Sequence, residues 1–128
     1  MNVELTKKQQ FKQEFKKRCF LFSISILRLS EKLNDKRINW VLIDQLIRAA
    51  TSVGANIVEG GNSTSKREFV NFFQIALKSS PESLYWLAIL KEMNLEKKDE
   101  IHKLIQECSE IKKIISTIIL NTKTNSRF

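Results

Sequence analysis

The chain has 128 residues, 42% of them hydrophobic, with only three glycines and one proline, so it is long enough for one domain with a real core. So few turn-forming residues argue against a small strand-rich fold and favour a few long helices. The formal net charge is +8, from 22 Lys and Arg against 14 Asp and Glu, which favours contact with polyanions such as nucleic acid. Charge alone is equally compatible with a surface that serves only solubility.

The two cysteines, Cys19 and Cys108, lie among apolar neighbours and have neither metal-ligand spacing nor a disulfide pattern. Reduced, buried thiols in a cytoplasmic protein are therefore expected. The apolar run at residues 19–27 follows a basic stretch, as in a signal peptide. It is broken by serines, ends at Arg28 and is too short to span a bilayer. We therefore expect a core helix here and no membrane contact.

The first helix is expected over residues 6–33, where apolar residues recur every three or four positions and share one helical face. These residues are Phe11, Phe15, Cys19, Phe22, Ile26, Leu29 and Leu33. Lys8, Lys12 and Lys16 repeat every four residues and are expected largely off that face, as a basic ridge.

The second helix is expected over residues 39–59, with an apolar face of the same period. That face comprises Trp40, Ile43, Leu46 or Ile47, Ala50, Val53 or Gly54, and Ile57. The second half of this helix carries mostly small residues. Gly54 lies among them and costs about 1 kcal/mol of helix stability against Ala, so a close contact or a bend is expected there.

The clearest break in the chain lies at residues 60–64, which contain two glycines, an asparagine and two hydroxyl residues. Gly60 stands where a helix C-terminus favours a left-handed residue. Ser65 and Glu68 match a capping box. In this motif the hydroxyl accepts a hydrogen bond from an amide N–H of the first turn, and the carboxylate accepts one from the Ser65 N–H.

The third helix is expected over residues 66–93 and the fourth over residues 97–121. Pro81 removes one amide and clashes with the preceding turn, so either a kink or a split into two helices at Ser79–Ser80 is expected. Four helices with short loops predict an all-α, up-down-up-down antiparallel four-helix bundle in a single domain, residues 1–128. The third helix has too many apolar residues for one face, which favours a homo-oligomer.

The segment QLIRAATSVGANIVEGGNSTSKRE, residues 45–68, together with residues 72–90, resembles the four-helix bundle proteins associated with intervening sequences in bacterial 23S ribosomal RNA genes. The resemblance implies a cytoplasmic homopentamer with no known enzymatic activity. A similar bundle, the accessory variability protein of diversity-generating retroelements, is a basic pentamer that binds nucleic acid and partners a reverse transcriptase. This chain departs from the pattern at Gly54, where many relatives have proline, and at Pro81.

Polar residues of this segment have structural as well as functional interpretations. Asn56 and Glu59 lie one helical turn apart, and we expect them to serve free backbone groups around the turn at 60–65; the alternative is a polar site at a subunit interface. Arg48 is expected to pair with Glu59 or Glu68, and its alternative role is a phosphate contact.

The candidate nucleic-acid contacts are the basic residues of the first helix and of the first turn of the third. They are Lys8, Lys12, Lys16, Lys17, Arg18, Lys66 and Arg67. On the first helix they would hold phosphates without reading bases. On the third helix, these residues either form an anion site or lie in a solvated turn. Phe11 and Phe15 interleave with the lysines but are expected in the core rather than as stacking platforms.

No catalytic motif, phosphate-binding loop or zinc-ligand set is present, and the single histidine, His102, is expected to face solvent. Trp40 and Trp86 are expected as packing anchors. We therefore expect no enzyme, cofactor or metal. The predicted function is non-enzymatic binding of nucleic acid, structured RNA in particular, by an oligomer. The alternative is a protein-interaction scaffold whose charge serves only solubility.

Overall fold

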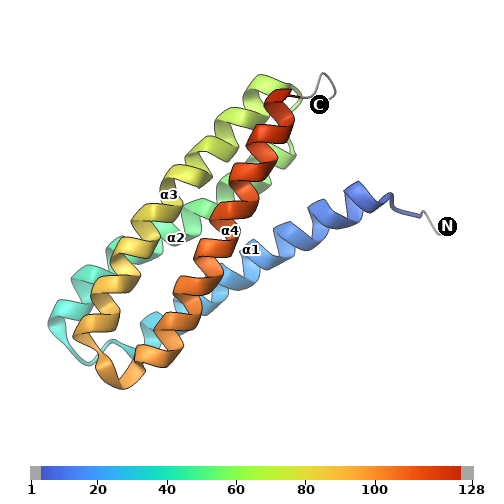
Figure 1. Ribbon diagram of the computed structural model, residues 1–128. Coiled ribbons are helices and arrows are strands. Elements are labelled where there is room, and N and C mark those ends of the chain that lie inside the picture. The colour runs from blue at the N-terminus through green and yellow to red at the C-terminus, as the bar shows by residue number, and fades with distance from the viewer. Residues whose placement is uncertain (1–3, 125–128) are drawn as a thin grey trace.

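The structure is a computed structural model that describes residues 4–124. Its helices are α1 (Lys7–Lys32), α2 (Arg37–Gly61), α3 (Lys66–Met93) and α4 (Lys98–Thr124), with a 3-10 turn, η1 (Leu95–Lys97), before α4. Successive helices run antiparallel and pack into a four-helix bundle (Figure 1). The predicted all-α fold is confirmed, and each helix ends within three residues of its predicted position.

Side-chain caps begin two of the helices. At α1, Thr6 Oγ1 accepts from the Gln9 N–H at 3.1 Å, and Gln9 Oε1 accepts from the Thr6 N–H at 2.9 Å, which makes a complete capping box. At α3, Ser65 Oγ accepts from the Glu68 N–H at 3.1 Å. The predicted start of α3 is confirmed through the Ser65 cap, but the structure shows only this half of the predicted capping box and no bond from the Ser65 N–H to the Glu68 carboxylate.

The end of α2 differs from the prediction at Gly60. The helix continues through Gly61, Asn62 caps it, and none of the glycines in the described chain has a positive φ. A Cβ on Gly60 would lie only 2.7 Å from Cδ1 of Phe73. Glycine is therefore required here for the close approach of α2 and α3, and the left-handed cap predicted from the sequence is wrong.

α3 is one continuous helix through Pro81, so the alternative of two helices split at Ser79–Ser80 is wrong. Proline removes the main-chain hydrogen bond to Leu77 O, and side chains bond the carbonyls on either side of that one. Ser80 Oγ donates to Ala76 O at 2.9 Å, and Ser83 Oγ donates to Ser79 O at 2.9 Å. The Cys108 thiol of α4 donates to Ser80 O at 3.7 Å, which joins α4 to this part of α3.

The core runs along the bundle and draws apolar side chains from all four helices. Its largest fully buried members include Ile26, Leu29, Leu33, Leu46, Ile57, Leu87, Leu90, Ile101, Ile111 and Ile115. α2 is the one described helix that length and composition alone would allow to cross a membrane. One side of α2 is part of this core, whereas Ile38, Trp40, Val41 and Val58 of the same helix are exposed.

A buried pair of amides joins the start of α2 to the end of α3. Asn39 Nδ2 donates to Asn94 Oδ1 at 2.9 Å, and Asn94 Nδ2 donates to Asn39 Oδ1 at 3.0 Å. Asn94 Nδ2 also donates to Leu90 O at 3.0 Å. Both side chains are fully buried, and these bonds satisfy the polar groups that burial would otherwise leave without partners.

The N-terminal half of α1 diverges from the other helices, which stay side by side along their length (Figure 1). Residues 7–14 are all exposed, and burial on α1 begins at Phe15. Phe11 is 48% exposed, so its predicted place in the core is wrong. Trp40 is also exposed and its Nε1 donates to Asn34 O at 2.7 Å, whereas Trp86 packs against the core as predicted.

Candidate functional site

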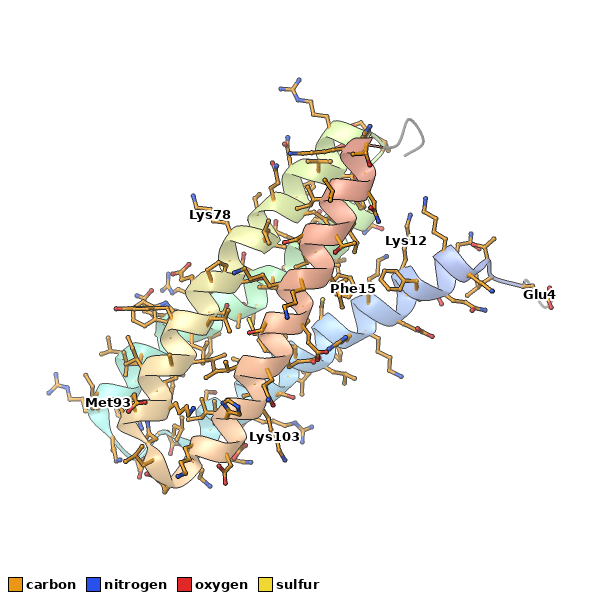
Figure 2. All side chains as sticks on the ribbon, viewed as in Figure 1. Glu4, Lys12, Phe15, Lys78, Met93 and Lys103 are labelled. Carbon is orange, nitrogen blue, oxygen red and sulfur yellow. The ribbon has the colours of Figure 1, made fainter. Side chains whose placement is uncertain are left out.

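The divergence of α1 leaves a groove of about 400 Å³ at one end of the bundle. All four helices contribute to it. The apolar lining consists of Phe11 and Phe15 of α1, Ile57 and Gly61 of α2, Phe69 and Phe73 of α3, and Ile118 of α4. Figure 2 shows Lys12 and Phe15 on the side of α1 that is turned toward the other helices. Phe15, Ile57, Phe69 and Phe73 of this lining are buried core residues, whereas Phe11 is half-exposed.

Lys8, Lys12 and Lys16 lie along the α1 side of this groove. The Lys16 side chain lies over Gly61. A Cβ added to that glycine would be 2.9 Å from Lys16 Cε and 3.2 Å from Lys16 Nζ. This places an ammonium group at the C-terminal end of α2, where the helix dipole favours a positive charge.

The charges in the groove are of one sign. None of the described residues that line it is Asp or Glu. Partial burial lowers the pKa of Lys12 from its usual value, and the positive charges of Lys8 and Lys16 lower it further. An anion placed among these ammonium groups would relieve their repulsion, so the electrostatics of the groove suit a negatively charged ligand.

Two aromatic pairs stand in the groove. The rings of Phe11 and Phe15 are nearly parallel, 9° apart with centroids separated by 6.3 Å. On α3, the rings of Phe69 and Phe73 stack with centroids 4.1 Å apart. Asn121 and Thr122 of α4 are the uncharged polar residues of the lining, which gives the groove hydrogen-bonding groups beside its aromatic walls.

The other predicted phosphate contacts lie in different surroundings. Lys17 is exposed on α1 outside the groove, and Lys66 and Arg67 lie in the first turn of α3, at the same end of the bundle. Arg18 is held by two carboxylates of α4. Its Nε and NH2 bond both carboxylate oxygens of Glu107 at 2.8 and 2.7 Å, and NH2 bonds Glu110 at 2.7 Å.

The hydrogen bond with Glu107 raises the pKa of the Arg18 guanidinium above its already high value. This residue therefore joins α1 to α4 just where the groove begins, and its charge is paired with the two carboxylates. Arg18 is therefore not expected to contact a phosphate.

Arg48, Asn56 and Glu59 of α2 do not line the groove. Arg48 Nε lies 3.3 Å from Asp44 Oδ2, with both side chains exposed, so the predicted pairing with Glu59 or Glu68 is wrong. Asp44 lies one turn before Arg48 on the same helix, and such a local pair forms without help from the rest of the fold.

Asn56 bonds within α2 and not to the turn that follows it. Its Nδ2 donates to Ser52 O at 2.8 Å and to Ser52 Oγ at 3.1 Å, and Ser79 Oγ of α3 bonds the same hydroxyl at 3.0 Å. The backbone N–H groups of residues 62 and 63 in the turn donate hydrogen bonds to carbonyls of α2, without help from the Asn56 and Glu59 side chains. Glu59 is exposed. The predicted role of these two side chains at the turn is therefore wrong.

Gly54 lies against α1, which agrees with the close contact expected at this position. A Cβ there would lie 3.4 Å from Ser23 Oγ and 3.5 Å from Cys19 O, which are ordinary contact distances. The contact is close but leaves space for a methyl group, in contrast to Gly60.

Sequence reasoning missed the groove because it placed Phe69, Phe73 and Ile118 in a closed core. A signal was present in the spacing of the lysines. Lys8 and Lys12 precede Phe15 and Cys19 by seven residues each, so on an α-helix they continue the core-facing side. Charged residues on that side indicate that no neighbouring helix covers it.

The two cysteines and the single histidine lie outside the groove. Burial raises the pKa of Cys19 and of Cys108 to about 12, so both thiols are protonated at neutral pH. Within residues 4–124 there is no group of three or more His, Cys, Asp or Glu side chains placed to hold a metal ion. His102 is exposed, with its Nδ1 3.4 Å from Lys91 Nζ.

Comparison with known proteins identifies a family and a similar fold among solved structures. The sequence profile of the 23S rRNA-intervening sequence protein matches residues 12–117. A protein of unknown function from the S23 ribosomal protein family of Bacteroides thetaiotaomicron VPI-5482 is 30% identical, with a TM-score of 0.78 over 84% of this chain and 96% of the other. No curated protein matches the chain significantly.

Proposed function

Because the chain belongs to the 23S rRNA-intervening sequence protein family, we propose that it binds nucleic acid, RNA above all, as a non-enzymatic protein. The observation that carries the proposal is the gathering of Lys8, Lys12 and Lys16 around one groove whose described lining has no carboxylate. Lys66 and Arg67 add positive charge at the same end of the bundle. Phosphates are the partners that such a cluster suits.

The binding would be driven by charge. Each lysine that neutralises a phosphate releases condensed counterions, so affinity falls as salt concentration rises. Partial burial lowers the pKa of Lys12 most, and the charges of Lys8 and Lys16 lower it further; a nearby phosphate would offset this second, repulsive contribution.

The test compares two triple variants of equal charge in a fluorescence-anisotropy titration with RNA at several salt concentrations. Lys8→Gln, Lys12→Gln, Lys16→Gln removes the groove lysines. Lys97→Gln, Lys98→Gln, Lys103→Gln removes three lysines from η1 and the start of α4, at the other end of the bundle, where Figure 2 labels Lys103.

The first variant is expected to bind weakly. Its plot of log K against log salt concentration should be less steep by roughly two, since each of the three lost phosphate contacts contributes about 0.7 for a single strand. The second is expected to keep most of the slope. Equal losses in the two variants, or binding insensitive to salt, would contradict the proposal.

We also infer that the chain self-associates. The outer sides of α2 and α3 carry large apolar side chains that are half or more exposed, among them Trp40 and Val41 at 61% each and Tyr85 at 61%. Exposure of this kind favours a protein interface. Several copies would bring several basic grooves onto one RNA and raise its affinity through multivalency. Sedimentation equilibrium measures the mass directly, and a monomer at all concentrations would contradict this inference.

The same exposed residues also support the alternative of a protein-interaction scaffold. That function predicts capture of one specific protein partner, equally by the wild type and by the groove-lysine variant, and no RNA bound to the purified protein. The anisotropy titration separates the two functions, because a scaffold has no salt-dependent affinity for RNA.

A further inference from the structure

We propose that the groove between α1 and the ends of α2, α3 and α4 takes an unpaired base, so that the ligand of this protein is single-stranded nucleic acid. The inference rests on the proposed function and deepens it, because phosphate contacts alone do not distinguish a single strand from a duplex.

The size and openness of the groove suit one nucleotide. Its volume of about 400 Å³ lies within the range of about 300–1,000 Å³ that is typical of small-ligand sites. A base inside a duplex is stacked and paired and cannot enter. A base in a single strand has both faces and its hydrogen-bonding edge available.

Phe11 is the side chain placed to receive the base. It is 48% exposed although it is a large apolar residue, and it lines the groove beside Phe15. In proteins that bind single strands, aromatic side chains of this kind stack on bases of any sequence. An exposed phenylalanine between lysines is therefore an arrangement for stacking, and the expectation that Phe11 only fills the core does not hold.

Charged and polar groups line the groove together with its aromatic wall. Lys8, Lys12 and Lys16 repeat at about 6 Å along the helix axis, comparable with the distance between neighbouring phosphates of an extended strand. From α4, the amide of Asn121 offers both a donor and acceptors to a base edge. Thr122 Oγ1 already donates to Ile118 O at 2.7 Å, which leaves its oxygen as an acceptor.

The chain offers a matched control for Phe11. Phe20 lies on the same helix and is 62% exposed, but it is nine residues away and so on the opposite side of α1, outside the groove. Phe11→Ala and Phe20→Ala therefore make the same chemical change on one helix, and both positions are exposed enough for the variants to fold.

The experiment measures the anisotropy of three labelled RNAs with the full chain: a 12-nucleotide oligouridine, the same strand with abasic sites, and a blunt duplex of equal length. The wild type is expected to prefer oligouridine to the duplex. Phe11→Ala should weaken oligouridine binding by about 5- to 100-fold, the range that corresponds to loss of one stacked base. Its salt slope should not change, and Phe20→Ala should bind as the wild type does.

The abasic strand keeps the phosphates and lacks the base, so the wild type should bind it about as weakly as Phe11→Ala binds oligouridine. Equal affinity for duplex and single strand, or equal effects of Phe11→Ala and Phe20→Ala, would overturn the inference while the lysine-dependent binding stands. If replacing the groove lysines has no effect on any of the RNAs, the proposed function itself fails. Retention of full oligouridine affinity by Phe11→Ala, with competition by a medium-chain fatty acid, would assign the groove to an amphipathic anion instead.

Discussion

Gly54 and Gly60 show how the same residue in one helix serves different needs. An added Cβ would meet Phe73 at 2.7 Å at Gly60, but would meet only Ser23 Oγ at 3.4 Å at Gly54. Gly60→Ala is expected to lower the free energy of unfolding by about 1–3 kcal/mol through overpacking. Gly54→Ala is expected to be neutral or to stabilise the protein by up to about 1 kcal/mol through helix propensity. Urea denaturation measures both, and a Gly60→Ala variant as stable as the wild type would contradict the packing argument.

The Asn39–Asn94 pair provides a second prediction at the residue scale. Asn39→Ala removes both bonds between the side chains and leaves part of the buried Asn94 amide unsatisfied, which is expected to cost about 1–3 kcal/mol. The double variant Asn39→Ala, Asn94→Ala should cost less than the sum of the single variants. A double-mutant cycle measures this coupling, and strict additivity would show that the two amides do not act as a pair.

Among the elements, α1 is the one held least firmly. Its first two turns are exposed, and the ion pairs of Arg18 with Glu107 and Glu110 join it to α4 beside the groove. Arg18→Gln is expected to cost about 0.5–1 kcal/mol, because the groups are partly exposed. It should also speed amide exchange across the N-terminal half of α1. Lys17→Gln, a neighbouring exposed residue, is the control, and equal exchange rates in the two variants would contradict this role for Arg18.

The sequence predicted the elements well where local patterns decide them. Periodic apolar residues and the Ser65 cap predicted α3 at Lys66–Met93, and the structure has the same bounds. Of the two outcomes expected at Pro81, division of this helix does not occur. Neighbouring serines and Cys108 of α4 bond carbonyls around this proline, and Cys108 lies 27 positions further along the chain, which local pattern reasoning does not reach.

At the scale of the whole molecule, the burial of both thiols makes stability depend on pH. The pKa of Cys19 and of Cys108 is raised from 9.0 to about 12 by burial. Between pH 9 and 12 the unfolded chain has lost thiol protons that the native state keeps, so the free energy of unfolding falls as pH rises. Below pH 9 this effect is absent, because both states are protonated.

Urea denaturation at pH 8, 9 and 10 checks this linkage. The variant Cys19→Ala, Cys108→Ala is expected to be less stable at every pH, because it leaves cavities, but to lose less stability between pH 8 and 10 than the wild type. Both thiols should also resist alkylation in the native state and react once urea unfolds the bundle. A parallel loss of stability in the variant and the wild type would show that other groups cause the pH dependence.

The sequence by itself determined the helices, their order and the main core residues, because helix periodicity and capping depend on residues within a few positions of each other. Only the tertiary structure decided where α1 leaves the bundle. Lys8, Phe11 and Lys12 share the face that Phe15 and Cys19 bury, and whether a helix face is covered depends on distant neighbours. The candidate site is therefore made of residues that local patterns assigned to a core and to a separate basic ridge. Packing brings them together, because the ends of α2, α3 and α4 leave that face of α1 open.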